Sequence, residues 1–433
     1  MSLRWFFSYG SVEGNWVYPL LPDILVNPLA SAVPAAMLSI LIFLITDRFI
    51  ERREKTCVAT WWITGMALAL LLRQSARFNL SSIIESDVSN GYFAASLRYG
   101  PLTVLNNYPV LSELSMHPAG NMPGKILLFH ALRIFTTSSQ AMGFMLVALA
   151  CLIGPITYAL MCEAGFSKRI ALRAMILSLV MPAFVGFMPI LNTVTPVIAL
   201  TVFLLSLIAA HRNNKFTAMG AGLAALILIL FEPTPFILIS TGVFVIGDEL
   251  QTGKIRWKQL RTTGLTAIGT MIIGLLTLRI LTGFDLFAAL HNVAKMGMSF
   301  NEADRPYVRW LIPNLKDFFM GAGILPSLVF LLAIVSITRL FVHRSSSRRG
   351  KKFAELPPNA IALVIGTVTA VLLLDILGLI RGEAVRHWIF LMPFVMMIAA
   401  WMTTSKRWLF IVILSMTILQ TSLSLWAIGF VIP

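Results

Sequence analysis

Apolar stretches about twenty residues long recur along the whole chain, and they restrict its fold more than any other feature. A helix of about twenty residues crosses the roughly 30 Å hydrocarbon layer of a membrane. Hydrophobic residues make up 58% of the chain and charged residues only 12%, too few to cover a soluble globule. No alternating pattern of the kind seen in transmembrane β-barrels competes with these stretches. The sequence therefore predicts an all-α integral membrane protein.

We expect a polytopic bundle of about twelve membrane-spanning helices, within a range of about eleven to thirteen. No repeat or linker divides the chain, so residues 1–433 are expected to form a single transmembrane domain. The apolar stretches are centred near residues 38, 66, 150, 179, 203, 224, 241, 272, 332, 368, 395 and 418.

The distribution of Lys and Arg predicts the orientation of these helices, because basic loops resist translocation across the membrane. Most of the basic residues are crowded into the loops of one side, and fewer are spread over the longer segments of the other side, so the basic loops are expected to be cytoplasmic. The net charge of +15 then reflects membrane anchoring and attraction to anionic lipids, and we expect no nucleic-acid partner. The basic loops are residues 47–55, 168–173, 212–215, 254–261, 344–352 and 406–407.

The same orientation places five other segments together on the extracytoplasmic face of a plasma membrane or bacterial inner membrane. Residues 74–124 form the first large loop, with short helices at the membrane interface, and residues 283–323 form the second. Three short turns accompany them, near Asn192, near Glu232 and at 380–388. A site for chemistry is expected where these segments converge.

The three cysteines, Cys57, Cys151 and Cys162, lie in or beside apolar stretches and outside these loops. They predict neither a disulfide framework nor a zinc site, and we expect them to pack in the interior.

The loop 74–124 carries the two residues of greatest chemical interest, Asp87 and the His117 of the sequence HPAG. By itself, an acid before a short helix is commonly an N-cap or a first-turn charge. A lone histidine on a surface turn is more often structural than catalytic. Gly120 and Gly124 allow close approach of another backbone, and Lys125 opens an apolar helix.

A loop acid followed by Tyr and an Ala-containing helix, then His-Pro-x-Gly and an amphipathic helix, resembles the GT-C superfamily of membrane glycosyltransferases. These enzymes use polyprenyl-phosphate-linked sugars and include protein mannosyltransferases and the aminoarabinose transferases of lipid A. Three further stretches look like bacterial members of the superfamily: PILNTVTP at 189–196, the segment 291–323 and RGEAVRHWIFLMP at 381–393.

The resemblance implies roles for two residues of the first loop. Asp87 matches the acid that deprotonates or orients the acceptor nucleophile, or that holds a divalent cation such as Mg²⁺ or Mn²⁺. His117 matches the histidine near the donor phosphate, and would be the second metal ligand if a metal binds. Relatives often carry a second acid beside the first, where this chain has Val88, which puts metal binding in doubt.

Sugar transfer from a lipid phosphate needs cations for the negative charge that develops on the departing phosphate. Arg381 and Arg386 bracket Glu383 at the outer mouth of two spans, where a guanidinium can grip phosphate through paired hydrogen bonds. The alternative is that they are interfacial arginines, one of them paired with Glu383. Secondary phosphate candidates are Lys125, Arg305 and Arg309.

Asn192 and Glu232 either line an acceptor cavity or cap helix ends next to prolines, and His291 belongs to the second loop. Asp375 lies within the apolar run AVLLLDILGLI, where a carboxylate is costly. We expect it to face the bundle interior as an interhelical partner that supports the site, or, in a transporter, to line an ion pathway.

The preferred function is transfer of a sugar from a polyprenyl-phosphate donor to a lipid, glycan or protein acceptor on the extracytoplasmic face. A transporter or lipid-linked glycan flippase also has about twelve helices, but is expected to show duplicated halves. A polymerase or ligase of surface polysaccharide is expected to carry its large outer loop late in the chain. A non-catalytic subunit of a transferase complex is the remaining alternative.

Overall fold

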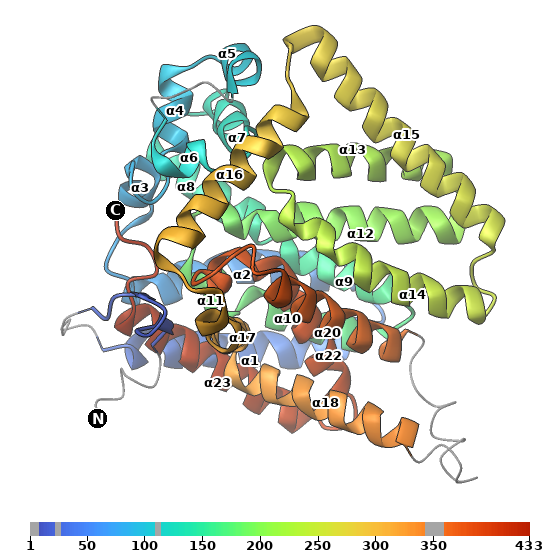
Figure 1. The fold of residues 1–433 in the computed structure, drawn as a ribbon. Helices are drawn as coiled ribbons and strands as arrows, with labels where there is room; N and C mark the ends of the chain where they lie inside the picture. The colour runs from blue at the N-terminus through green and yellow to red at the C-terminus, as the bar shows by residue number, and fades with distance from the viewer. Residues whose placement is uncertain (1–7, 22–26, 109–113, 343–358) are drawn as a thin grey trace.

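The computed structural model describes residues 8–21, 27–108, 114–342 and 359–433, and it is almost entirely helical (Figure 1). Seven spans of 18 to 26 residues are long and apolar enough to cross a membrane, or eight if a bent pair is counted as one more. They support an integral membrane protein. Six of them are built on α1 (Leu29–Phe49), α2 (Glu54–Leu72), α12 (Thr195–Arg212), α15 (Trp257–Thr282), α20 (Ala360–Leu377) and α23 (Arg407–Ala427); the seventh joins α8 (Ser139–Ala150) to α9 (Ile153–Glu163).

Four of the twelve predicted spans are shorter helices. The apolar stretches centred near 179, 224, 241 and 395 contain helices of 12, 17, 13 and 11 residues. At 1.5 Å per residue, a 12-residue helix covers only about 18 Å. By length and composition the described residues thus support fewer spans than the sequence predicted. These helices are α10 (Lys168–Leu179), α13 (Lys215–Phe231), α14 (Ile239–Gln251) and α22 (Met392–Met402).

The predicted span near residue 332 is half of the bent pair, α17 (Tyr307–Ala322) and α18 (Ile324–Val342). The two helices meet at 113° around Gly323. Gly323 has a φ of +118°, a conformation that side chains other than glycine rarely adopt. The glycine therefore allows the chain to turn sharply here.

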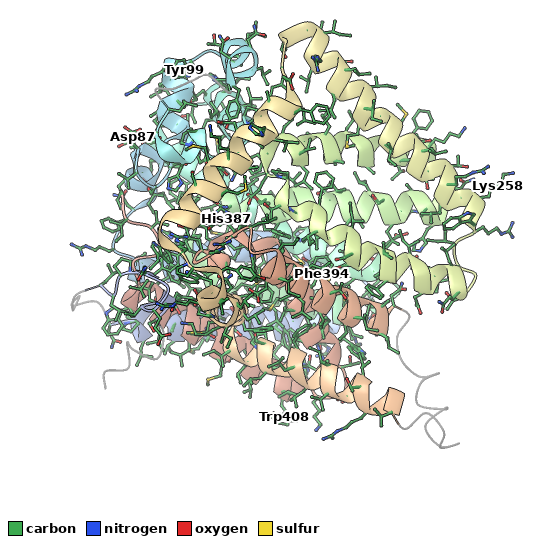
Figure 2. The ribbon with its side chains drawn as sticks, viewed as in Figure 1. Asp87, Tyr99, Lys258, His387, Phe394 and Trp408 are labelled. Carbon is green, nitrogen blue, oxygen red and sulfur yellow. The ribbon has the colours of Figure 1, made fainter. Side chains whose placement is uncertain are left out.

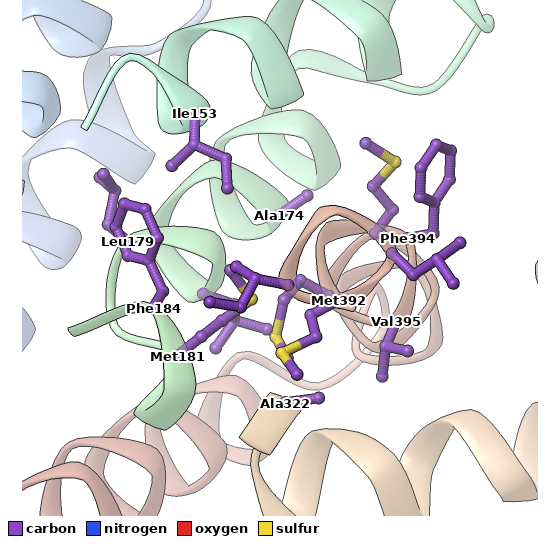
Figure 3. Packing of buried hydrophobic residues seen from close by; sticks show 14 of the residues in the cluster. Ile153, Ala174, Leu179, Met181, Phe184, Ala322, Met392, Phe394 and Val395 are labelled. Carbon is purple, nitrogen blue, oxygen red and sulfur yellow. The ribbon is translucent and has the colours of Figure 1, made fainter. Parts of the chain in front are cut away.

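The core is built around α10 and α22, which pack against each other and are buried on all sides. Figure 3 shows Leu179 and Phe184 on one side of this contact and Met392 and Phe394 on the other. A helix that is apolar all round is stable only when other elements surround it. This explains how apolar segments too short to span a membrane alone can lie at the centre of the bundle.

A second apolar cluster fixes the first large loop to the bundle. It contains Ile84, Tyr92 and Phe129 from the loop and its last helix, together with Phe231 at the end of α13 and Phe284 before α16. The helices of this end, seen at the upper left of Figure 1, are α3 (Leu80–Glu85), α4 (Tyr92–Arg98), α5 (Pro101–Asn106), α6 (Met116–Ala119) and α7 (Gly124–Arg133), with α16 (Leu286–Asp304) beside them.

The remaining elements are short. A hairpin of β1 (Gly10–Ser11) and β2 (Trp16–Val17) pairs antiparallel before the first long helix. The other short helices are α11 (Pro182–Gly186), α21 (Ala384–His387), η2 (Arg73–Ser75), η4 (Leu191–Thr193), η5 (Thr234–Leu238) and η6 (Ile389–Leu391).

The five segments predicted to converge do so. Hydrogen bonds and ion pairs join the first loop to the second, Asn192 and Glu232 to His387, and the second loop to Glu383. The prediction that they gather at one end of the bundle, here called the loop end, is confirmed. That this end is extracytoplasmic stays a prediction. The basic run 344–352, one of the loops on which the predicted orientation rests, lies outside the described residues.

Candidate functional site

A group of buried and partly buried charged side chains lies at the loop end of the bundle. We call it the outer cluster, and it comprises Lys125, Glu232, Arg305, Glu383, Arg386 and His387. Its members come from elements far apart in the sequence: the start of α7, the end of α13, the end of α16 and the α21 turn. Figure 2 places His387 near the middle of the molecule, where these elements meet.

Lys125 and Glu232 form the first half of the outer cluster. Lys125 Nζ lies 3.1 Å from Glu232 Oε2, and the side chains are only 1% and 5% exposed. The Thr195 hydroxyl, at the start of α12, donates to the same carboxylate oxygen at 2.7 Å. Lys125 also donates to Asn121 Oδ1 at 2.8 Å, which ties it to the turn that follows HPAG.

Gly124 makes the contact between α7 and α13 possible. A Cβ at this position would lie 2.5 Å from the carbonyl oxygen of Leu230 and 2.9 Å from the Cα of Phe231. Both are backbone atoms at the end of α13, so neither can move aside easily. The prediction that Gly124 allows close backbone approach is confirmed, and the approach sets Lys125 next to Glu232.

We therefore expect Gly124→Ala to lower the free energy of unfolding by about 1 to 3 kcal/mol, the usual cost of overpacking. Gly264→Ala is the matched control, because a Cβ at Gly264 in α15 would meet no atom within 4 Å. There alanine should be neutral or stabilising by up to about 1 kcal/mol, since it favours helix. Denaturant unfolding of both variants in detergent measures the difference. Equal changes in the free energy of unfolding for the two variants would show that the close approach of α7 to α13 does not depend on glycine at position 124.

Glu383 forms the second half of the outer cluster. Arg386 Nη2 donates to Glu383 Oε2, and Arg305 Nη2 donates to Oε1 at 3.4 Å. The spacing of Glu383 and Arg386 by three residues puts both side chains on one face of the α21 turn. Within the described residues, Arg386 Nε is buried without a hydrogen-bond partner.

His387 links the two halves. Its Nδ1 lies 3.5 Å from Glu232 Oε1, and its Nε2 lies 3.5 Å from Glu383 Oε2. Asn192 Nδ2 is also 3.5 Å from His387 Nδ1. The imidazole thus stands between the buried carboxylate of Glu232 and the partly buried one of Glu383, and Asn192 comes with it into the site.

The charges of the outer cluster hold its carboxylates ionised. Burial alone would raise the pKa of Glu232, but Lys125 and His387 outweigh it and hold that pKa well below its usual range. Burial acts in the same sense on Glu383, where Arg386, His387 and Arg305 overcome it and lower the pKa. Burial lowers the pKa of the Lys125 ammonium, and Glu232 opposes this effect.

His117 lies close enough to the outer cluster for the charges of the cluster to shift its pKa. Burial, followed by the charge of Arg386, lowers the pKa of His117 from 6.5 to about 4, so the imidazole is neutral at pH 7. The turn around it is held by two tyrosines: the Tyr108 hydroxyl donates to the Pro118 carbonyl at 2.7 Å, and the Tyr92 hydroxyl donates to the His117 carbonyl at 3.4 Å.

Arg381 and Arg309 lie beside the outer cluster and have other partners. Arg381 Nη1 donates to the Arg305 carbonyl at 3.0 Å, and its guanidinium lies over the ring of Tyr307, 5.3 Å from the centroid. Arg309 Nη1 donates to the carbonyl of Glu13 in the N-terminal hairpin at 2.9 Å.

Asp375 supports the turn that carries the cluster. Asn314 Nδ2 on α17 donates to Asp375 Oδ1 on α20 at 3.4 Å and to the Ile380 carbonyl at 3.1 Å. Asn314 Oδ1 accepts from the Gly382 amide at 3.2 Å. The prediction of an interhelical partner is confirmed, because Asp375 fixes residues 380–382 through Asn314.

Asp87 and His291 are exposed and stand outside the outer cluster. Asp87 lies in the turn between α3 and α4, and the residue preceding α4 is Gly91, so Asp87 does not cap that helix. Figure 2 shows Asp87 at the edge of the molecule, away from His387. His291 lies in α16, whose Asn292 Nδ2 donates to the Ala119 carbonyl of the HPAG turn at 3.2 Å.

The donor set that a divalent cation would need does not come together. In the part of the chain that the structure describes, no three His, Cys, Asp or Glu side chains are placed to hold a metal ion. Asp87 and His117, the two candidate ligands, belong to no such group among these residues.

Two members of the site were not singled out from the sequence. His387 follows Glu383 by four residues, and this spacing within RGEAVRH was a signal that pointed to one shared face. Thr195 carried no such signal, because its partner Glu232 is brought to it only by the packing of α12 against α13. The sequence matches no protein-family model, and a search of curated proteins found no match to it either.

Proposed function

We propose that this protein is a membrane glycosyltransferase that moves a sugar from a polyprenyl-phosphate donor to a lipid, glycan or protein acceptor on the extracytoplasmic face. The observation that carries the proposal is the outer cluster, which gathers Lys125, Arg305 and Arg386 where two long loops meet. The helices long and apolar enough to cross a membrane support a lipid-linked substrate that enters from the bilayer.

The cations of the outer cluster suit the departing phosphate. Charge builds up on the phosphate oxygens as the bond to the sugar breaks, and buried, preorganised donors stabilise such charge far better than water does. The Arg386 side chain is 14% exposed, and its Nε makes no hydrogen bond among the described residues, so the surrounding protein leaves part of the guanidinium's hydrogen-bonding capacity unused. Glu232 and Glu383 keep the cations in place before the donor arrives.

The acceptor hydroxyl must lose a proton to a base. The two cluster carboxylates are poorly suited, because nearby cations lower their pKa values and so weaken them as bases. Asp87 is exposed and free to meet an acceptor, and the resemblance to GT-C enzymes assigns it this role. His387, between Glu232 and Glu383, is the other candidate for proton transfer.

The test is an assay of purified protein in liposomes with a panel of polyprenyl-phosphate sugars, following the release of polyprenyl phosphate. Asp87→Asn should lower turnover by about 10²- to 10⁴-fold if Asp87 is the base. Glu85→Gln, which alters the exposed acid at the end of α3, is the matched control and should leave turnover unchanged. Unchanged turnover in folded Asp87→Asn, together with a loss in His387→Gln, would move the role to His387. Absence of release from every donor would contradict the proposal.

Transport of an anionic lipid is the second candidate function. Transporters often place broken helices at the substrate site, and the bend of 113° between α17 and α18 lies next to the turn that carries Arg386. Flipping of a fluorescent polyprenyl-phosphate sugar across liposomes, without release of polyprenyl phosphate, would favour this function over sugar transfer.

A further inference from the structure

A groove of about 600 Å³ opens between α2, α9 and α12, far from the outer cluster. Helix α9 packs against both α2 and α12, so it forms the floor of the groove, and the other two helices form its walls. On α2 the wall consists of Val58, Ala59 and Trp62, which recur at the spacing of one helix face.

The other two helices present matching apolar faces. On α12, Leu204 and Ile208 are four residues apart, and on α9, Pro155 and Ala159 are four residues apart. The indole of Trp62 is fixed as a wall, since its Nε1 donates to the Ala148 carbonyl at 3.2 Å. The body of the groove is therefore apolar and shaped by rigid elements.

The mouth of the groove is charged. Lys55 and Arg212 stand at its rim, at the first turn of α2 and the last turn of α12. Among the described residues Lys55 makes no ion pair, and Arg212 makes one, at 3.5 Å to Glu163. An apolar slot with exposed cations at one end is complementary to an amphiphile with an anionic head.

The two carboxylates at the same mouth also have basic partners. Glu54 Oε2 lies 2.7 Å from Lys168 Nζ. Glu163 Oε1 lies 2.8 Å from His211 Nδ1, in addition to its contact with Arg212. His211 is shared with a third carboxylate, since its Nε2 lies 2.8 Å from Glu249 Oε2. Lys55 is thus the rim cation that makes no ion pair among the described residues.

Helix α12 fixes the position of the groove relative to the outer cluster. Its first residue, Thr195, bonds to Glu232, and its last residue, Arg212, stands at the groove mouth. At 1.5 Å per residue the two positions are about 25 Å apart along the helix, close to the thickness of a hydrocarbon layer. The mouth thus lies at the opposite membrane boundary, at the end of the bundle that carries basic residues.

We infer that this groove binds a phospholipid with an anionic headgroup from the leaflet opposite the outer cluster. An acyl chain lies along Trp62 and the facing walls of α9 and α12, and Lys55 and Arg212 hold the headgroup phosphate. Phosphatidylglycerol is the simplest lipid of this chemistry. The groove is separate from the proposed donor site, so this inference does not depend on whether the protein transfers a sugar.

The experiment measures quenching of Trp62 by phospholipids with brominated acyl chains, in vesicles of phosphatidylcholine. The contribution of Trp62 is the difference between the wild type and Trp62→Phe. Brominated phosphatidylglycerol should quench it at a mole fraction at least about tenfold lower than brominated phosphatidylcholine does. Each cation near an anionic headgroup favours binding by about fivefold, so Lys55→Gln with Arg212→Gln should abolish this preference.

Two controls make the result specific. Arg256→Gln with Lys258→Gln removes the same charge from exposed positions at the start of α15, outside the groove, and should leave the preference unchanged. Ala159→Phe fills the groove and should prevent quenching by either lipid. Equal quenching by both lipids in the wild type, or a preference that survives loss of Lys55 and Arg212, would overturn the inference.

Discussion

Replacing Lys125 by methionine is expected to lower the free energy of unfolding by about 3 to 5 kcal/mol, the cost of breaking a buried ion pair on one side. The change removes the cation from Glu232 and leaves the carboxylate buried, with Thr195 and the more distant His387 as its remaining partners. Methionine fills a similar volume, so lost packing contributes little. Thermal or denaturant unfolding in detergent gives the value.

Adding Glu232→Gln to Lys125→Met should recover much of this loss. The neutral amide no longer needs a cation and can still accept a hydrogen bond from Thr195, so little uncompensated charge stays buried. Lys168→Met is the control, because the pair of Lys168 and Glu54 is 40% exposed on both sides and should contribute far less to stability than the buried pair. An equal cost for Lys125→Met and Lys168→Met would show that the buried pair does not stabilise the fold.

Arg386→Gln should lower kcat/KM for sugar transfer by about 10²- to 10³-fold, the range found when one donor to a developing oxyanion is removed. The substitution takes away a partly buried guanidinium whose Nε has no partner in the described part of the chain, while Arg305 still pairs with Glu383. The protein should therefore remain folded, which the unfolding curve in detergent checks separately from activity.

Arg309→Gln is the matched control for this effect. Arg309 is an exposed arginine of α17 that bonds to the Glu13 carbonyl and lies outside the outer cluster. Its loss should leave kcat/KM unchanged. If both variants lose activity to the same extent, the effect comes from the general positive charge of the loop end, and the specific role of Arg386 is wrong.

The long helices were predictable because their apolar stretches match the thickness of a membrane. The lengths of the shorter helices were not predictable, since an apolar run that spans a bilayer and one that is buried among other helices have the same composition and pattern. The apolar run centred near residue 395 begins with the short helix η6, so α22 itself starts only at Met392. Whether such a segment lies in the core depends on its neighbours, which the local sequence does not describe.

The candidate site was predictable where its residues are close in sequence. Glu383 and Arg386 belong to one short turn, and their pairing follows from a spacing of three residues. Lys125 and Glu232 were each singled out, but their pairing depends on the approach of α7 to α13 at Gly124. Asp87 stood out by chemistry and resemblance, neither of which places it relative to the turn of Arg386.

The most direct test of the account is photo-crosslinking with a polyprenyl-phosphate sugar that carries a photoreactive group next to its phosphate. The protein is labelled in liposomes, digested and analysed by mass spectrometry for the modified peptides. If the outer cluster holds the donor phosphate, the label will appear in residues 117–125 or 381–388, and excess unlabelled donor will compete it away. Specific labelling confined to other segments, or no competition by the donor, would contradict the assignment of the outer cluster as the phosphate site.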